Sequence, residues 1–185
     1  MNRKIAAACG SFLFAGIVAR ALPQDGPPLP KPQKEHEWLR QLVGEWDAEG
    51  EACMEPGKPP IQIKGTESSR MIGGFWAVFE HRGDFMGSPF TGIMTLGYDP
   101  ERKKYVGTWI DSMGSYLWRY EGTLDASGRI LTLDSEGPCH ETPGKLAKYR
   151  ESIEIKDKDR KHFVSKIERN GQWVTGMTMT SRRRK

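Results

Sequence analysis

The side chains that could do chemistry in this chain are a few acids that lie among apolar residues. Glu67, Asp111 and Glu151 each share the parity of apolar neighbours, so in a strand they would point to the apolar side. A carboxyl group buried there would have a raised pKa and could act as a general base or hold the polar end of a ligand. An inward arginine such as Arg70 or Arg82 would be its more ordinary partner.

The histidines are the second group with chemical potential. They are His36, His81, His140 and His162, and no two of them have the His-x-x-x-His spacing of a zinc site. His81 shares the face of Phe79 and His140 lies in a loop, so either could reach an interior as a haem ligand. We predict no metal and no cofactor, with haem as the alternative. G-x-S-x-G and phosphate-binding glycine motifs do not occur, so enzymatic activity is also only an alternative.

Ten short segments of alternating apolar and polar residues must position these side chains. Turn signals separate them, at 45–53, 61–72, 75–83, 90–98, 103–111, 116–124, 129–136, 148–156, 161–169 and 172–182. One short helix is expected over 35–42, where Trp38, Leu39 and Leu42 share a face; it is expected to cover the outside of the third strand. The pattern predicts an all-β fold, a closed up-and-down antiparallel barrel of about ten strands.

The alternation also predicts which side chains fill the barrel. In the first strand, acids alternate with Trp46, Ala48, Gly50 and Ala52, so the second set faces inward. Trp173 has the same parity as Met177 and Met179. Aromatic and methionine walls bind apolar molecules, whereas small residues leave room for them. The expected ligand-binding residues are Trp46, Phe79, His81, Met94, Tyr105, Trp109, Asp111, Trp118, Tyr120 and Met177.

The turns differ between the two ends of the expected barrel. Short, mostly charged turns close one end. The other end has connections at 54–60, 84–89, 112–115 and 137–147 and the Asn170-Gly171 turn, and three of these are longer. They carry Phe85, Met86, Met113 and His140, which predicts a mouth for a ligand, with packing of these side chains on the rim as the alternative. Cys53 and Cys139 fall at this end, so either a disulfide or two free thiols fits the sequence.

The ends of the chain carry processing and linker signals. Residues 1–21 have a basic start, an apolar run and Ala19-Arg20-Ala21, as a signal peptide does; we therefore expect export to the periplasm or beyond and no transmembrane segment in the mature protein. Residues 22–34 are a proline-rich lead-in, 35–182 the barrel and 183–185 a frayed basic tail. The net charge of +4 comes from the leader and tail, which argues against nucleic-acid binding.

Several motifs together resemble a known family. Gly44-Glu45-Trp46 after a short helix resembles the G-x-W signature of lipocalin and calycin barrels. With His36 to Leu39, Gly73 to Trp76, Gly97 to Asp99 and Tyr105 to Ser112, the chain is similar to the bacterial domain-of-unknown-function family 1579 over residues 35–182. The resemblance implies a calycin-like barrel without an established reaction, in which Trp46 plugs the closed end and Arg182 packs on it. The strand number resembles nitrobindin-type haem barrels in architecture only.

These observations predict an exported barrel that sequesters or carries a small, largely apolar molecule, as a monomer or weak dimer. Asp111 or Glu67 would be the polar anchor of the ligand. Two alternatives remain: a periplasmic enzyme that uses an inward carboxylate or His81 on a hydrophobic substrate, and a filled barrel that serves as a structural or interaction module.

Overall fold

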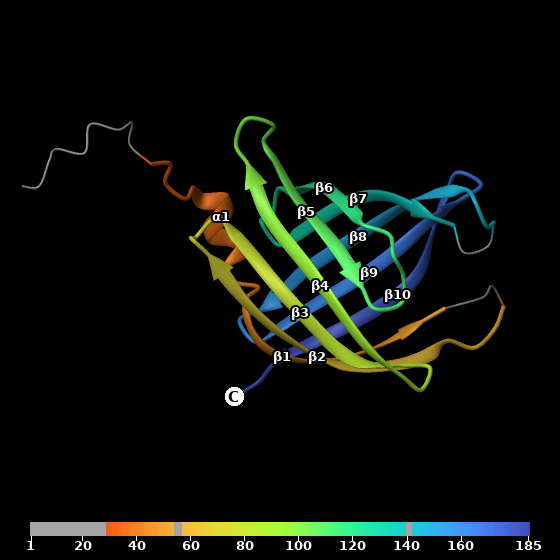
Figure 1. Cartoon of the computed structure of the whole chain (residues 1–185). Coiled ribbons are helices and arrows are strands. Elements are labelled where there is room, and N and C mark those ends of the chain that lie inside the picture. The colour runs from red at the N-terminus through yellow and green to blue at the C-terminus, as the bar shows by residue number, and fades with distance from the viewer. Residues whose placement is uncertain (1–28, 54–56, 140–141) are drawn as a thin grey trace, which may run out of the picture. The chain divides into compact units, whose positions relative to one another are not determined.

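The computed structural model describes residues 29–53, 57–139 and 142–185, and Figure 1 shows the helix and the strands. Within these residues, one short helix precedes ten strands. The elements are α1 (Lys34–Leu39), β1 (Gly44–Ala52), β2 (Ile61–Ile72), β3 (Trp76–Phe85), β4 (Ser88–Asp99), β5 (Lys104–Asp111), β6 (Trp118–Leu124), β7 (Ile130–Pro138), β8 (Leu146–Asp157), β9 (Arg160–Arg169) and β10 (Gln172–Arg183). The predicted leader 1–21, most of the lead-in and His140 lie outside the described residues.

The strands form one closed antiparallel barrel in which each strand pairs with its neighbours in sequence. Closure comes from β1, which pairs with β2 on one side and with β10 on the other. Trp46 illustrates this, because it lies opposite Glu67 in β2 and Arg183 in β10. The predicted all-β barrel of ten strands is therefore confirmed.

The alternation of side chains in each strand divides the interior from the surface. In β1, Trp46, Ala48 and Ala52 are buried and the intervening acids are exposed. At the end of the barrel next to α1, the interior is filled by leucines that are at most 1% exposed: Leu39, Leu42, Leu96, Leu131 and Leu133. This end is a packed hydrophobic core.

Helix α1 caps this filled end of the barrel (Figure 1) and does not cover the outside of β3 as expected. Trp38 Nε1 donates a hydrogen bond to the Gly128 carbonyl in the β6–β7 turn, at 2.8 Å, and its ring packs on the inward Tyr105. Tyr105 in turn donates its hydroxyl to the Glu35 carbonyl, at 3.2 Å. Trp76 on the outer face of β3 stays 43% exposed, because the apolar face of the helix is used to close the barrel.

An irregularity in β10 reverses the side-chain parity within that strand. The register against β9 shifts between Thr175 and Met177. Met177 and Met179 therefore lie opposite Ala52 and Gly50 in β1, on the inner face, whereas Trp173 points outward. The expectation that Trp173 shares their face was wrong, because a β-bulge adds one residue that simple alternation does not count.

The two cysteines of the barrel are free thiols, Cys53 exposed and Cys139 partly buried, so the structure does not contain the disulfide that the sequence allowed. None of the described helices is long and apolar enough to cross a membrane.

Candidate functional site

The half of the interior farther from α1 is lined by aromatic and methionine side chains that are not fully buried. Trp109, Trp118, Met177 and Met179 lie at inward positions of β5, β6 and β10, yet each keeps part of its surface accessible. Since these side chains point into the barrel, their remaining exposure shows that solvent reaches this half. The core cluster instead holds Phe79, Met94, Tyr105 and Tyr120, all buried, and Trp109 and Trp118 pack against it. The predicted ligand-binding residues thus divide between fully buried core residues and partly accessible residues at the edge of that core.

Trp46 is buried at the base, and two cations pack on its ring. Its ring lies 4.0 Å from the Arg183 guanidinium carbon and 4.5 Å from Lys161 Nζ. Arg183 also donates to the carbonyls of Val43 and Gln41, at 2.8 and 3.2 Å. The arginine that packs on the tryptophan is therefore Arg183, not Arg182, whose side chain is 60% exposed.

The basic C-terminal segment is therefore part of the barrel. β10 continues through Arg183, and Arg184 Nε donates to Asp47 Oδ1 at 2.6 Å. The expectation of a frayed tail over 183–185 was wrong for these two residues. Arg183 binds the carbonyls of Val43 and Gln41 just before β1, and Arg184 binds Asp47 in β1.

Glu67 forms a buried ion pair with Lys161, the lysine that lies over the Trp46 ring. Lys161 Nζ donates to both carboxylate oxygens, at 2.6 and 2.8 Å, and Ser69 Oγ lies 3.0 Å from Oε1. Burial lowers the pKa of Lys161, and the charge of Glu67 opposes that shift. The expected arginine partners, Arg70 and Arg82, are exposed on the outer face. Glu67 is therefore already bound within the protein and is not a free ligand anchor.

His81 stands between this ion pair and the aromatic lining. Its Nδ1 is 3.9 Å from Glu67 Oε2 and its ring meets the Trp109 ring edge-on at 5.2 Å. Burial lowers the pKa of His81, with Glu67 opposing and Lys161 reinforcing the change, so the neutral imidazole is favoured. The side chain is still 26% exposed and faces the interior as predicted.

Asp111 is committed to its own neighbours. Trp109 Nε1 donates to Oδ2 at 2.7 Å and the Met113 amide donates to Oδ1 at 2.8 Å. Phe90 stacks on Trp109 with ring centroids 6.2 Å apart, and Gly92 lies under the indole, where a Cβ atom would meet it at 2.2 Å. Asp111 thus holds Trp109 in place, and its role as a ligand anchor stays a prediction.

Glu151 is the inward acid that keeps an open oxygen. It is 7% exposed and lies in β8 opposite Leu133 and Ser165. Ser165 Oγ donates to Oε1 at 3.2 Å, whereas Oε2 has no hydrogen-bond partner among the described residues. Burial raises the pKa of Glu151 to about 8, and the serine opposes this only in part, so the carboxyl group is mostly protonated at neutral pH.

The structure gives no basis for a metal centre in the described residues, which hold no cluster of three or more His, Cys, Asp or Glu side chains. For haem, only His81 of the two candidates can be placed. Its Nδ1 side faces Glu67, and Trp109 contacts its ring.

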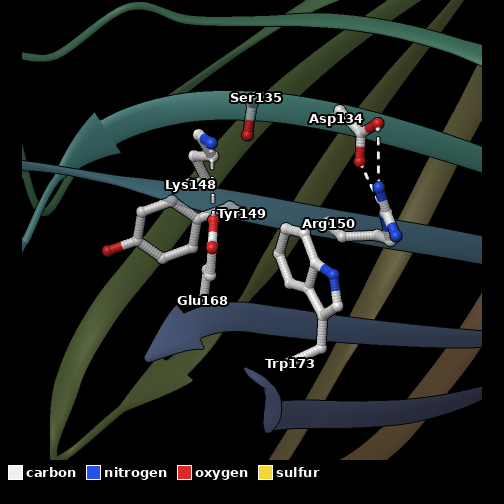
Figure 2. A pocket seen from close by; sticks show the side chains of 7 residues that line it. All are labelled: Asp134, Ser135, Lys148, Tyr149, Arg150, Glu168 and Trp173. Carbon is white, nitrogen blue, oxygen red and sulfur yellow. Dashed lines mark hydrogen bonds and ion pairs between the residues drawn. The ribbon is translucent and has the colours of Figure 1, made fainter. Parts of the chain in front are cut away.

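A hollow lies on the outer face of β7, β8, β9 and β10 (Figure 2), with a volume of about 410 Å³. Arg150 donates to Asp134 at 2.7 Å, and its guanidinium lies 4.4 Å from the Trp173 ring centre. Lys148 and Glu168 form an ion pair beside it, at 3.7 Å. These groups satisfy one another, so this hollow is a cross-strand network and carries little binding capacity of its own.

Sequence reasoning missed Lys161, Ser165 and Arg183. Lys161 and Ser165 share the parity of Phe163 and Ile167, which was the available signal, but the other face of β9 is also mixed and does not settle the direction. Arg183 could be found only if β10 was known to extend to this residue. The basic run at the end of the chain indicates a tail instead.

Comparisons with known proteins agree with this architecture. The crystal structure of Rv2717c from M. tuberculosis has a TM-score of 0.61 at 16% sequence identity and covers 84% of this chain and 100% of that chain. A redesigned β-barrel, b11L5F_LGL, has a TM-score of 0.44 at 10% identity and covers 79% and 94%. Another, mFAP0 bound to DFHBI, has a TM-score of 0.43 at 11% identity and covers 77% and 99%. At 16% identity the likeness to Rv2717c shows the fold alone.

A search of the curated proteins gives no match. The model of one family, DUF1579, matches residues 31–183, which is nearly the whole barrel and its capping helix. The chain therefore belongs to DUF1579, a family of proteins of unknown function.

Proposed function

We propose that this protein binds a small, largely apolar molecule inside the upper half of its barrel, the half farther from α1. The observation that supports this most strongly is the contrast between the two halves of the interior. Leucines that are at most 1% exposed fill the base, whereas inward tryptophans and methionines of the upper half stay partly exposed. Accessible aromatic and methionine walls in a closed barrel are typical of ligand sites.

The loops around this half support entry of an apolar ligand from the same end. Met86, Met113, Leu117 and Leu146 lie on or beside these loops and are 45–73% exposed. At the opposite end, α1 and Trp46 close the barrel. A ligand would therefore enter between the β3–β4, β5–β6 and β7–β8 connections.

A fluorescence titration tests this function. The neutral apolar dye N-phenyl-1-naphthylamine is added to the purified barrel, and oleic acid, retinol and haemin are then tested as competitors. We expect saturable binding of one dye per chain and energy transfer from tryptophan. Trp109→Ala should weaken binding about fivefold or more, because it removes an aromatic wall.

Trp173→Ala is the matched control. It removes a 36% exposed tryptophan from the outer face of the same barrel, so dye affinity should stay within about twofold of the wild type. Absence of saturable binding, or equal losses in the two variants, would instead support a filled barrel.

We also propose that the protein works outside the cytoplasm. The support is the basic start, apolar run and small residues before Leu22. Expression of the full chain with a cleavable leader should give an extracytoplasmic protein that begins at Leu22. A cytoplasmic protein that retains Met1 to Ala21 would contradict export and leave ligand binding unaffected.

A further inference from the structure

Two polar atoms on adjacent strands of the barrel wall lack partners. Ser135 Oγ and Glu151 Oε2 are buried, and neither has a hydrogen-bond partner among the described residues. In the β7–β8 pairing, Ser135 lies opposite Tyr149 and Leu133 lies opposite Glu151. Ser135 and Glu151 are therefore diagonal neighbours on the same inner face, with Cβ atoms roughly 7 Å apart.

Two other polar groups nearby are already used within the protein. The Tyr149 hydroxyl donates to the Pro138 carbonyl at 2.7 Å, and Ser165 donates to the other oxygen of Glu151 at 3.2 Å. Buried polar atoms almost always have partners, and an unmade hydrogen bond destabilises the fold. Two such atoms on diagonal neighbours of one inner face are therefore suited to a group supplied by a ligand.

We infer that Ser135 and Glu151 form a polar subsite that binds the carbonyl oxygen of a small, largely apolar ligand. This inference rests on the proposed function and specifies the chemistry of its ligand. The serine hydroxyl and the protonated carboxyl group are both donors, so together they match an acceptor with two lone pairs. A ketone, aldehyde or ester oxygen has this character, and a hydrocarbon does not.

The charge state of Glu151 fits a neutral ligand. Burial raises its pKa to about 8, so it is a donor at neutral pH and becomes an anion that repels a carbonyl oxygen above that value. The strands packed directly against it contribute Leu133 and Ser165. The titratable or charged groups on the surrounding inner faces are Tyr120, Asp111, Lys161 and Arg169.

Met177 provides a route to the buried carboxyl group. It lies opposite Ser165 in the β9–β10 pairing and is only partly buried. Its unbranched side chain rearranges more easily than that of other apolar residues. A ligand that enters the upper half can therefore displace Met177 and reach Glu151 past Ser165.

The test compares two isosteric ligands, 2-acetylnaphthalene and 2-isopropenylnaphthalene, which differ in a carbonyl oxygen against a methylene group. By calorimetric or fluorescence titration at pH 7, the wild type should bind the ketone about tenfold more tightly. The double variant Ser135→Ala/Glu151→Leu should lose this preference and still bind the hydrocarbon. Glu151→Gln should keep the preference, since its amide still donates.

Glu154→Gln is the matched control, because Glu154 lies three residues away on the outer face of the same strand and pairs with Lys156 at 2.7 Å. It should behave as the wild type. A pH series from 6 to 9.5 needs no variant: the wild-type preference for the ketone should fall above about pH 8, and that of Glu151→Gln should not.

The outcomes separate this inference from the proposed function. Equal affinity of the wild type for both ligands, or a ketone preference that survives in the double variant, overturns the subsite and leaves apolar binding in place. If neither ligand binds, the proposed function fails and the subsite fails with it.

Discussion

At the scale of single residues, two buried acids in the barrel interior differ in their hydrogen-bonding partners. Glu67 pairs with Lys161, which donates to both of its oxygens. Glu151 has a serine as its hydrogen-bonding neighbour, and its pKa rises to about 8. The first arrangement ties both carboxylate oxygens to a cation of the protein, whereas the second leaves a protonated carboxyl group with an unused oxygen. Glu151 is therefore better suited than Glu67 to meet a ligand.

Removal of one member of the buried ion pair should be strongly destabilising. Lys161→Ala leaves the Glu67 carboxylate buried without its partner, which should cost about 3 kcal/mol of the free energy of unfolding. Urea unfolding at pH 7 measures this value. Lys156→Ala, which removes an exposed ion pair with Glu154 on the outer face, is the control and should cost less than about 1 kcal/mol. Similar costs for the two variants would contradict a buried pair.

The raised pKa of Glu151 makes stability depend on pH in a defined direction. The folded state holds its proton up to about pH 8, whereas the unfolded state releases it near 4.5. The unfolded state thus binds fewer protons between these values, so the free energy of unfolding should decrease from about pH 4.5 to about pH 8 and then level off.

Glu151→Gln should remove this contribution. Urea unfolding from pH 5 to 9 should show a smaller decrease with pH in the variant, so that the stability difference between variant and wild type shifts in favour of the variant as pH rises. An identical pH dependence in the two proteins would show that Glu151 titrates normally.

At the scale of elements, the capping helix and the β10 irregularity determine where the accessible half begins. Helix α1 fills the base through Trp38 and Leu39, and the register shift before Met177 turns two methionines inward. Because of these two features, one end of the barrel is filled by buried side chains and the other is lined by partly accessible ones. Sequence alternation alone predicts neither of them.

Truncation of the cap should destabilise the barrel from its base. Trp38→Ala removes a buried indole and its 2.8 Å hydrogen bond to Gly128, so a loss of about 3 kcal/mol is expected. Thermal or urea unfolding checks this against Trp76→Ala, which removes a tryptophan that is 43% exposed on the outer face. A larger loss of stability for Trp76→Ala than for Trp38→Ala would contradict the capping role of the helix.

Deletion of Gly176 tests the parity reversal in β10. Without the extra residue, regular alternation still puts Trp173 and Met177 on opposite faces, because they are then three positions apart, so the Arg150 contact and the pairing with Ala52 are both kept. We expect the Tm to change by less than about 5 °C. Deletion of Thr178, in the regular part of β10 opposite Glu51, should instead turn Met179 outward and lower the Tm by about 10 °C or more. Equal losses for the two deletions would argue against the bulge.

Much of the fold could be predicted from the sequence because β1, β5 and β6 alternate cleanly between the two faces. Trp46, Trp109 and Trp118 face inward as expected. The errors lie where local pattern is ambiguous: an inserted residue moved Trp173 outward, and a basic run obscured Arg183 as part of β10. The ion partner of Glu67 could not be found, because contact between β2 and β9 depends on closure of the whole barrel.

At the scale of the whole molecule, the barrel is asymmetric along its axis. One end is closed by α1, Trp46 and the cations that pack on that ring. The other end carries exposed apolar side chains on its connections and an accessible aromatic lining. Membership in DUF1579 leaves the reaction or ligand open, and this asymmetry is the property from which a binding function follows.

Methionine methyl NMR tests that asymmetry most directly, since methionines lie at both ends of the barrel interior and on the rim. With ¹³C-methyl methionine, saturating N-phenyl-1-naphthylamine should shift the signals of Met177 and Met179 through the ring current of the dye. The signal of Met71, which packs against the base, should stay in place. Shifts confined to the exposed Met86 and Met113, or no saturable shift at all, would contradict a ligand site inside the barrel.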